Sequence, residues 1–255
     1  MILMRILPGV LKELSKHVPT VLFQTVEWSE LASELPKISR RIISKDGYED
    51  LYQQNKTLLD PYNIILTNAP LTRASIQKDK WAGEKWLTIY FAQIFSPHGL
   101  FIDLRSIHFH DERPALMWHP TGFWTKFNED FRLGLIKVYE GFYLDNDALY
   151  FEGLEEIGLL KEEFSPEDKE ELAHLFRKHF GAGISQEFKL DHFKESIIRM
   201  SEFMLNKKVK ISKDFLYLGI YLVTLYSSLE ETGAELPVKQ IYLDVKARFT
   251  SDEPR

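Results

Sequence analysis

The spacing of apolar side chains along the chain predicts a helical protein that is interrupted once by short strands. From residue 128 onward the apolar positions recur every three or four residues, the period of a helix with one buried face. Between residues 100 and 127 the pattern shortens to brief runs of β-prone residues. The predicted fold is therefore mainly α, of the α+β type, with one small hairpin or sheet near residues 100–127.

Capping residues mark where many of these helices begin and end. The segment 80–95 has a helical pattern and is followed by Pro97 and Gly99, which stop a helix. Asn128 and Ser165 each precede a first turn rich in acidic residues, as an N-cap does. Further helices are predicted at 128–143, 145–158, 165–181, 188–206, 212–231 with Ser212 as cap, and 237–248.

The strand region is expected to hold a hairpin. Its two arms are the runs 106–110 and 115–119, which flank a turn-like Asp-Glu-Arg-Pro at 111–114. The run 100–105 precedes them, and 123–127 is a candidate third strand.

Apolar residues are spaced less regularly in the first 80 residues. Residues 1–17 are predicted to form a short amphipathic helix and not a secretory signal, because Arg5 interrupts the apolar run. Residues 28–44 are helical in pattern with a break at Pro36, and 60–70 favour an extended segment or loop.

Length and composition are those of a globular protein. The 255 residues, 44% of them hydrophobic, can supply a core for one large domain or two modest ones. We predict an N-terminal helical segment at 1–80 and a helical domain at 81–255.

Charge and cysteine usage exclude several classes of function. The formal charge of -6 argues against nucleic acid as a partner. The absence of cysteine excludes disulfides and thiolate chemistry, and is compatible with the cytoplasm. No P-loop or dinucleotide fingerprint occurs, so no cofactor is assigned.

The most apolar run, residues 215–229, is shorter than the roughly 20 residues that cross a bilayer. We therefore predict a buried core helix and no transmembrane segment. The lysines at 206–213 keep peripheral membrane association open as an alternative. The expected partners are a protein or an apolar ligand.

Candidate chemistry concentrates between residues 98 and 124. The candidate ligand-binding residues are Asp103, Arg105, His108, His110 and His119. Imidazole and carboxylate are the usual metal ligands when thiolates are absent, but this spacing matches no zinc-hydrolase pattern. A hydrogen-bonded or solvated hairpin face is the favoured interpretation, and neither a metal site nor a catalytic residue is assigned.

Three segments resemble the AarF/UbiB atypical kinase-like family. Residues 87–101 resemble the aromatic-rich helix end that leads into the family's catalytic loop, and 127–160 and 210–236 resemble its later helices. The resemblance implies a protein-kinase-like C-lobe and a setting in isoprenoid-quinone or lipid metabolism.

The catalytic motifs of that family are degenerate here. Aligned through Gly99 and Phe101, the loop pattern H-x-D-x-H-x-x-N falls on residues 102–109, where only Asp103 remains as a carboxylate, one place out of register. The metal-binding D-F-G triplet falls on Pro120-Thr121-Gly122, and proline cannot ligate magnesium. The family's nucleotide-binding motifs are also not visible in residues 1–85.

The expected function is therefore that of a non-catalytic kinase-like accessory or binding protein, a pseudokinase. The alternative is a metal- or acid–base-dependent enzyme on an unrelated helical fold. That enzyme would use His108, His110 and His119 with Asp111 or Glu112.

Overall fold

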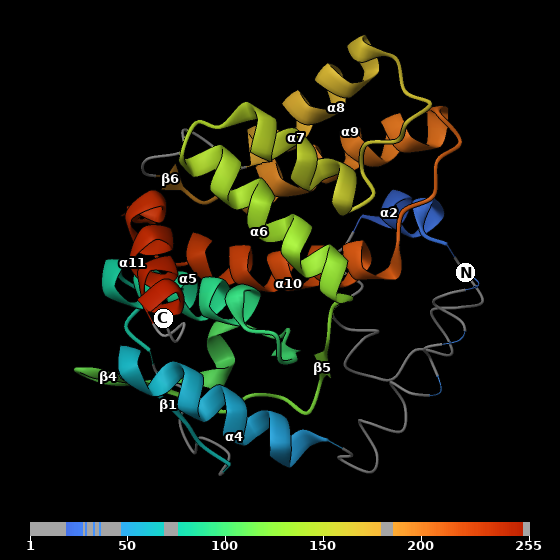
Figure 1. Ribbon diagram of the computed structural model, residues 1–255. Helices are drawn as coiled ribbons and strands as arrows, with labels where there is room; N and C mark the ends of the chain where they lie inside the picture. Colours follow the sequence, from blue (N-terminus) through green and yellow to red (C-terminus); the bar gives the residue numbers. More distant parts are fainter. Residues whose placement is uncertain are drawn as a thin grey trace.

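The computed structural model describes residues 19–27, 47–68, 76–179 and 186–251, together with Ser29, Ser33 and Pro36 (Figure 1). It is a mainly α fold with small β-sheets, which confirms the predicted class. The helix predicted at 1–17 and most of the one at 28–44 lie outside these residues.

The helices predicted from residue 80 onward are all present, with ends within a few residues of the predicted ones. They are α5 (Lys80–Phe95), α6 (Glu129–Tyr143), α7 (Asp147–Glu156), α8 (Pro166–His179), α9 (Leu190–Asn206), α10 (Lys213–Glu230) and α11 (Val238–Ser251). Two helices that the apolar pattern does not predict are α2 (Thr20–Thr25) and α4 (Tyr48–Leu59).

The strands pair differently from the prediction. Strand β4 (Ala115–Trp118) pairs with β3 (Phe109–Glu112) as an antiparallel hairpin, as expected, but its other neighbour is the parallel β1 (Ile64–Leu66). The predicted third strand at 123–127 contributes β5 (Trp124–Thr125), which pairs with β2 (Leu100–Phe101) instead. A separate sheet joins β6 (Gln186–Glu187) to β7 (Glu235–Leu236).

The run 100–105 is a strand only at its first two residues, and 106–108 form a 3-10 turn, η3 (Ser106–His108). Side chains of α10 supply hydrogen bonds to the backbone of residues 102–104, so this stretch does not join a strand ladder.

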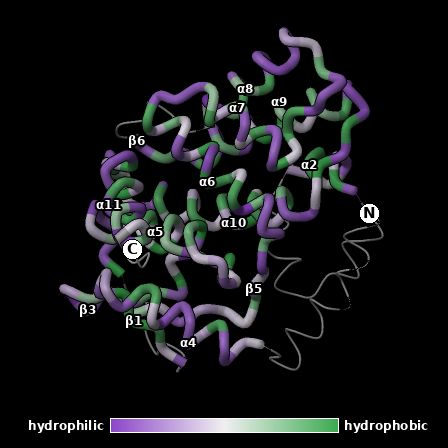
Figure 2. The backbone as a smooth tube through the Cα atoms, in the orientation of Figure 1, coloured by the Kyte–Doolittle hydropathy of each residue, from purple (hydrophilic) through white to green (hydrophobic). Residues whose placement is uncertain are grey.

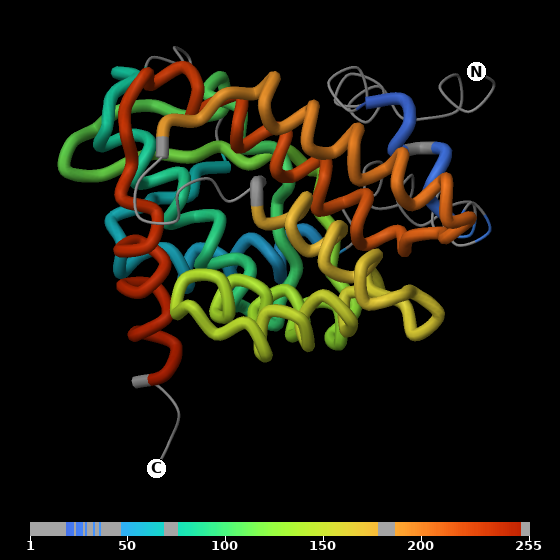
Figure 3. The backbone as a smooth tube through the Cα atoms, turned by 90° about the horizontal axis from the view of Figure 1, so that it is seen from above, coloured from blue at the N-terminus to red at the C-terminus, as the bar shows by residue number. Residues whose placement is uncertain are grey.

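Helix α10 is the centre of the core. Figure 1 shows it crossing the middle of the molecule, and most of its side chains are buried, as predicted for its sequence. In Figure 3, α9 runs alongside it, while α6 and α7 lie together below both. Figure 2 places the hydrophilic positions mainly on outer elements such as α8. Of the helices described, none is both long enough and apolar enough to cross a membrane.

The hairpin packs one face against the helices. Phe109 stacks on Trp118 across the two strands and makes a T-shaped contact with Trp86 on α5. Trp118 also contacts Phe101 of β2, and Phe101 contacts Tyr48 of α4. Since α4 and β1 share one hydrophobic core with α5–α11, the described part of residues 47–66 packs with the rest. The division at residue 80 stays a prediction.

Candidate functional site

The loop that carries Asp103 is fixed by helix α10. The hydroxyl of Thr224 accepts a hydrogen bond from the backbone N–H of Leu104 at 3.1 Å and lies 2.8 Å from the carbonyl oxygen of Ile102. Ser228 donates to the carbonyl of Leu104 at 2.7 Å. These bonds satisfy buried backbone groups on both sides of Asp103, and so they hold the loop in one conformation.

The Asp103 carboxylate is enclosed by two of the other predicted site residues. Its side chain is 0% exposed. Arg105 donates to one oxygen from Nε at 2.8 Å and to the other from Nη2 at 2.7 Å, a two-point pairing. His108 Nε2 lies 3.0 Å from the second oxygen, and the backbone N–H of Arg105 lies 3.3 Å from the first. Both carboxylate oxygens are therefore engaged within the loop.

These contacts determine the protonation of Asp103. Burial by itself would raise the pKa of this carboxyl, but the hydrogen bonds and charges of Arg105 and His108 outweigh burial and lower the pKa to about 2. A carboxylate with such a low pKa is a weak base, so Asp103 is poorly suited to accept a proton in catalysis.

The pairing predicts an acid-dependent part of the stability. Because the folded pKa lies below the unfolded value, the contribution is complete above about pH 4 and is lost as the pH falls towards 2. It amounts to about 2 kcal/mol in the free energy of unfolding. Urea unfolding between pH 6 and pH 2 should show this loss, and Asp103→Asn should lose correspondingly less over the same range. Parallel pH profiles for the two proteins would contradict the assignment.

The other two predicted residues face different partners. His110 Nε2 lies 2.9 Å from a carboxylate oxygen of Glu112, and His119 Nδ1 lies 2.8 Å from the carbonyl oxygen of Thr67. Within the described part of the chain, no three His, Asp or Glu side chains converge closely enough to hold a metal ion. The structure thus brings together Asp103, Arg105 and His108, and leaves His110 and His119 outside that cluster.

The spacing of Asp103, Arg105 and His108 in the sequence is a signal that could have indicated this cluster. If the family pattern H-x-D-x-H-x-x-N is set with its Asp on Asp103, the second His falls on Arg105 and the Asn falls on His108. In this register, which differs from the one through Gly99 and Phe101, both positions hold side chains that bind Asp103.

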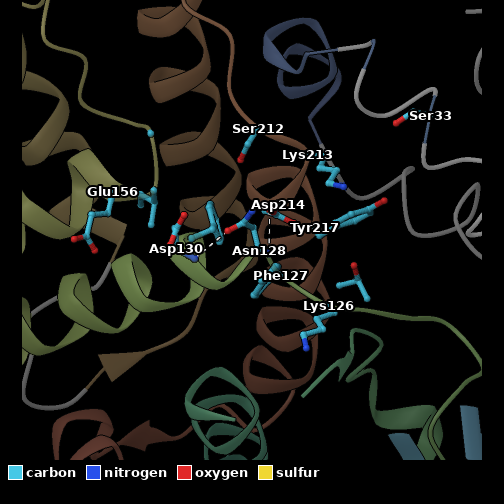
Figure 4. A pocket seen from close by; sticks show the side chains of 14 residues that line it. Ser33, Lys126, Phe127, Asn128, Asp130, Glu156, Ser212, Lys213, Asp214 and Tyr217 are labelled. Carbon is cyan, nitrogen blue, oxygen red and sulfur yellow. Dashed lines mark hydrogen bonds between the residues drawn. The ribbon is translucent and has the colours of Figure 1, made fainter. Parts of the chain in front are cut away.

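A second candidate site, which the sequence pattern does not predict, is a pocket of about 730 Å³ (Figure 4). It lies between the N-terminal ends of α6 and α10 and the C-terminal end of α7. Its buried lining residues are the apolar Phe127, Phe131, Ile157 and Tyr217 and the polar Thr125 and Asp214. Ser33 lies at the far side in Figure 4.

Asp214 couples the two helix starts at this pocket. Its side chain is nearly buried, and one carboxylate oxygen lies 3.3 Å from the backbone N–H of Asn128, the N-cap of α6. Asn128 in turn accepts from the N–H of Asp130 at 2.9 Å. A negative charge is favoured at a helix N-terminus, and Asp214 supplies one at the start of α10 and beside the start of α6.

The chain matches no protein-family model and no curated protein sequence. Its function must therefore be inferred from the chemistry of these two sites.

Proposed function

We propose that this protein is a non-catalytic, kinase-like accessory or binding protein. The observation that carries the proposal is the enclosure of the Asp103 carboxylate by Arg105 and His108. The catalytic-loop Asp of a protein kinase accepts the proton of the substrate hydroxyl. An Asp with no exposed oxygen and a pKa lowered to about 2 is unsuited to that step.

The order of elements around Asp103 supports the kinase-like part of the proposal. Helix α5 leads to the short strand β2, then to the loop with Asp103, then to the antiparallel pair β3 and β4 and to Pro120-Thr121-Gly122. Protein kinases place an Asn five residues after the catalytic Asp and a D-F-G triplet after the following hairpin, and both hold magnesium. In the register that sets Asp103 as the catalytic Asp, the Asn position holds His108, which binds Asp103. The D-F-G triplet, aligned separately, falls on Pro120-Thr121-Gly122, and Pro120 has no ligating side chain.

The proposed role in isoprenoid-quinone or lipid metabolism rests only on the family resemblance. A protein partner or an apolar ligand is the kind of binding that such an accessory protein would perform.

Calorimetric titration with ATP and magnesium tests the proposal. We expect no binding isotherm up to millimolar nucleotide, because neither a carboxylate nor an amide is free at the metal-holding positions. A one-to-one isotherm that is abolished by Asp103→Asn but retained by Asp111→Asn would overturn the non-catalytic assignment. A thermal-shift measurement of each variant confirms that it is folded before titration.

A second candidate function is a metal- or acid–base-dependent enzyme that uses His108, His110 and His119. One observation favours it: because the carbonyl oxygen of Thr67 can only accept, the Nδ1 of His119 is the donor in this contact, as in histidines that bind a metal through Nε2. Metal analysis of the purified protein decides between the candidates. Stoichiometric zinc, iron or manganese that is lost in His119→Ala and His110→Ala would support the metal-dependent form of this candidate, and metal-free protein would remove that form.

A further inference from the structure

We propose that the surface of α9 and α10 that holds residues 19–27 is a binding site for a short helical segment of a partner protein. Residues 19–27, here called the strap, fill this site as an internal ligand that the partner segment displaces. The strap comprises α2 and the residues on either side of it. The site is separate from Asp103, and the inference does not depend on the kinase-like proposal.

One face of the strap is completely buried. Helix α2 packs against α9 (Figure 1). Leu22, Thr25 and Val26 lie on the side of the strap that faces the protein, and each is 0% exposed. Leu22 lies against Gly219 of α10, where an added Cβ atom would be 3.1 Å from the Leu22 Cδ2. The glycine therefore gives the leucine room to approach the backbone of α10.

Polar contacts fix the end of the strap. A parallel β-bridge joins its last residues to Ile211. In this bridge the N–H of Ile211 donates to the carbonyl of Thr25 at 2.9 Å, and the N–H of Glu27 donates to the carbonyl of Ile211 at 3.1 Å. Lys210 donates from Nζ to the carbonyl of Gln24, in the last turn of α2, at 2.7 Å. The site thus recognises a short helix that continues as an extended chain.

The conformation of the strap is imposed by the site. Helix α2 has six residues, and isolated helices shorter than about 12–15 residues are marginal in water. Its N-cap is Pro19, whose side chain cannot accept a capping hydrogen bond. In the described residues the strap pairs with Ile211 through a single bridge and not a ladder. The strap therefore behaves as a peptide that folds where it binds.

Contacts that do not involve the strap hold the site in shape. Helix α9 packs on α8 and α10, and α10 packs on α5. Phe193 of α9 stacks on Tyr226 of α10 with ring centroids 4.7 Å apart. Phe203 of α9 meets Phe164 with ring centroids 5.8 Å apart. Since these helices are fixed independently, release of the strap would expose a surface that is already formed.

The strap defines the chemistry of the segment that replaces it. That segment has a leucine, a β-branched residue four positions later, and no charge between them, as residues 22–26 do. Exchange between two copies of this chain would only replace these contacts with identical ones, so it gains nothing. A segment of another protein can exceed the affinity of the strap, because it adds contacts of its own outside the site.

A fluorescent peptide of residues 19–27, capped at both ends, is the probe. The receptor is the full-length chain with Leu22→Asp, because a charge at this buried position should release the strap. We expect a one-to-one complex by fluorescence anisotropy. The unchanged chain should bind at least about tenfold more weakly, because its own strap competes at an effective concentration in the millimolar range. Circular dichroism confirms that the receptor is folded.

A lysine substitution in this receptor tests the polar contact. Lys210→Gln removes the ammonium that binds the carbonyl of Gln24 and should weaken peptide binding about three- to tenfold. Lys208→Gln is the matched control, because Lys208 is exposed and takes no part in the described contacts of residues 19–27. It should leave the affinity unchanged.

Hydrogen exchange of the unchanged chain tests the same inference without any substitution. The amides of Glu27 and Ile211 bond across the strap, so each becomes exposed when the strap opens. They should exchange at least about a hundredfold faster than the amide of Val223 in the middle of α10, and with little dependence on dilute urea, because opening is local.

Four outcomes would overturn the proposal. Exchange of Glu27 and Ile211 at the rate and urea dependence of Val223 would show that the strap opens only when the whole chain unfolds. Absence of peptide binding to the folded receptor at about 1 mM would show that the site does not accept a separate segment. Equal binding of the peptide and of its Leu22→Asp form would place it elsewhere. A dimer of the unchanged chain that Leu22→Asp abolishes would assign the site to a second copy. None of these results depends on whether the protein binds ATP.

Discussion

Asp103→Ala is expected to lower the free energy of unfolding by about 3 kcal/mol at neutral pH, because removing one partner of a buried ion pair leaves the other uncompensated. The side chains of Arg105 and His108 are only 19% and 16% exposed, so water would replace the lost carboxylate incompletely. The backbone N–H of Arg105 would also lose the carboxylate that accepts its hydrogen bond. Urea unfolding followed by circular dichroism measures the change.

The matched control for this prediction is Asp191→Ala. Asp191 also faces a basic side chain, Lys194 at 3.7 Å, but its own side chain is 94% exposed. An exposed ion pair and an acidic residue in the first turn of a helix each contribute little, so the loss should stay below about 1 kcal/mol. A double-mutant cycle with Arg105→Met adds a second check, since the double variant should lose less than the two single losses together. Additive losses would mean that the pairing does not stabilise the loop.

Local features of the fold were predictable because their signals are local. Asn128, Asn146, Ser165 and Ser212 were each expected near a helix start, and each accepts a hydrogen bond from a backbone N–H in the first turn. Such a cap depends only on residues two or three positions apart, and the sequence displays them directly.

The apolar pattern did not predict helix α4 because part of its buried face is polar. Asn55 is buried, and it accepts from Gln93 of α5 at 2.6 Å and donates to the carbonyl of Gly99. Gln93 accepts from the hydroxyl of Tyr221 on α10, also at 2.6 Å. The helix is therefore held by a buried network whose other members lie far along the chain, and a count of apolar positions does not register it.

The sheet and the pocket could not be predicted from the sequence, because both depend on contacts between residues far apart in the chain. The parallel partner of β4 is β1, about 50 residues earlier, and the sequence pattern of residues 60–70 indicates only an extended segment. The pocket arises because the starts of α6 and α10 meet, which depends on the packing of whole helices. Asp103, Arg105 and His108 could be named as candidates one by one, but their mutual binding follows from the conformation of the loop.

Helices α6 and α7 approach each other closely at two glycines, so a side chain added at either position should destabilise the protein. A methyl group at Gly141 would lie 2.6 Å from the Cα and 2.7 Å from the Cβ of Tyr150 on α7. A methyl group at Gly153 would lie 2.6 Å from the carbonyl oxygen of Gly134 on α6. These neighbouring atoms cannot rotate away, so any side chain here must push the two helices apart.

Gly141→Ala is therefore expected to destabilise the protein by about 2–3 kcal/mol, the cost of overpacking a close contact. The sign of the change is the informative quantity, because Gly→Ala within a helix otherwise stabilises by about 1 kcal/mol through helix propensity. Gly122→Ala is the control, since a methyl group there meets nothing within 4 Å and should leave stability nearly unchanged. Thermal or urea unfolding measures both variants. Stabilisation by Gly141→Ala would mean that α6 and α7 do not pack backbone against backbone, and the wall of the pocket formed by the end of α7 would then lie elsewhere.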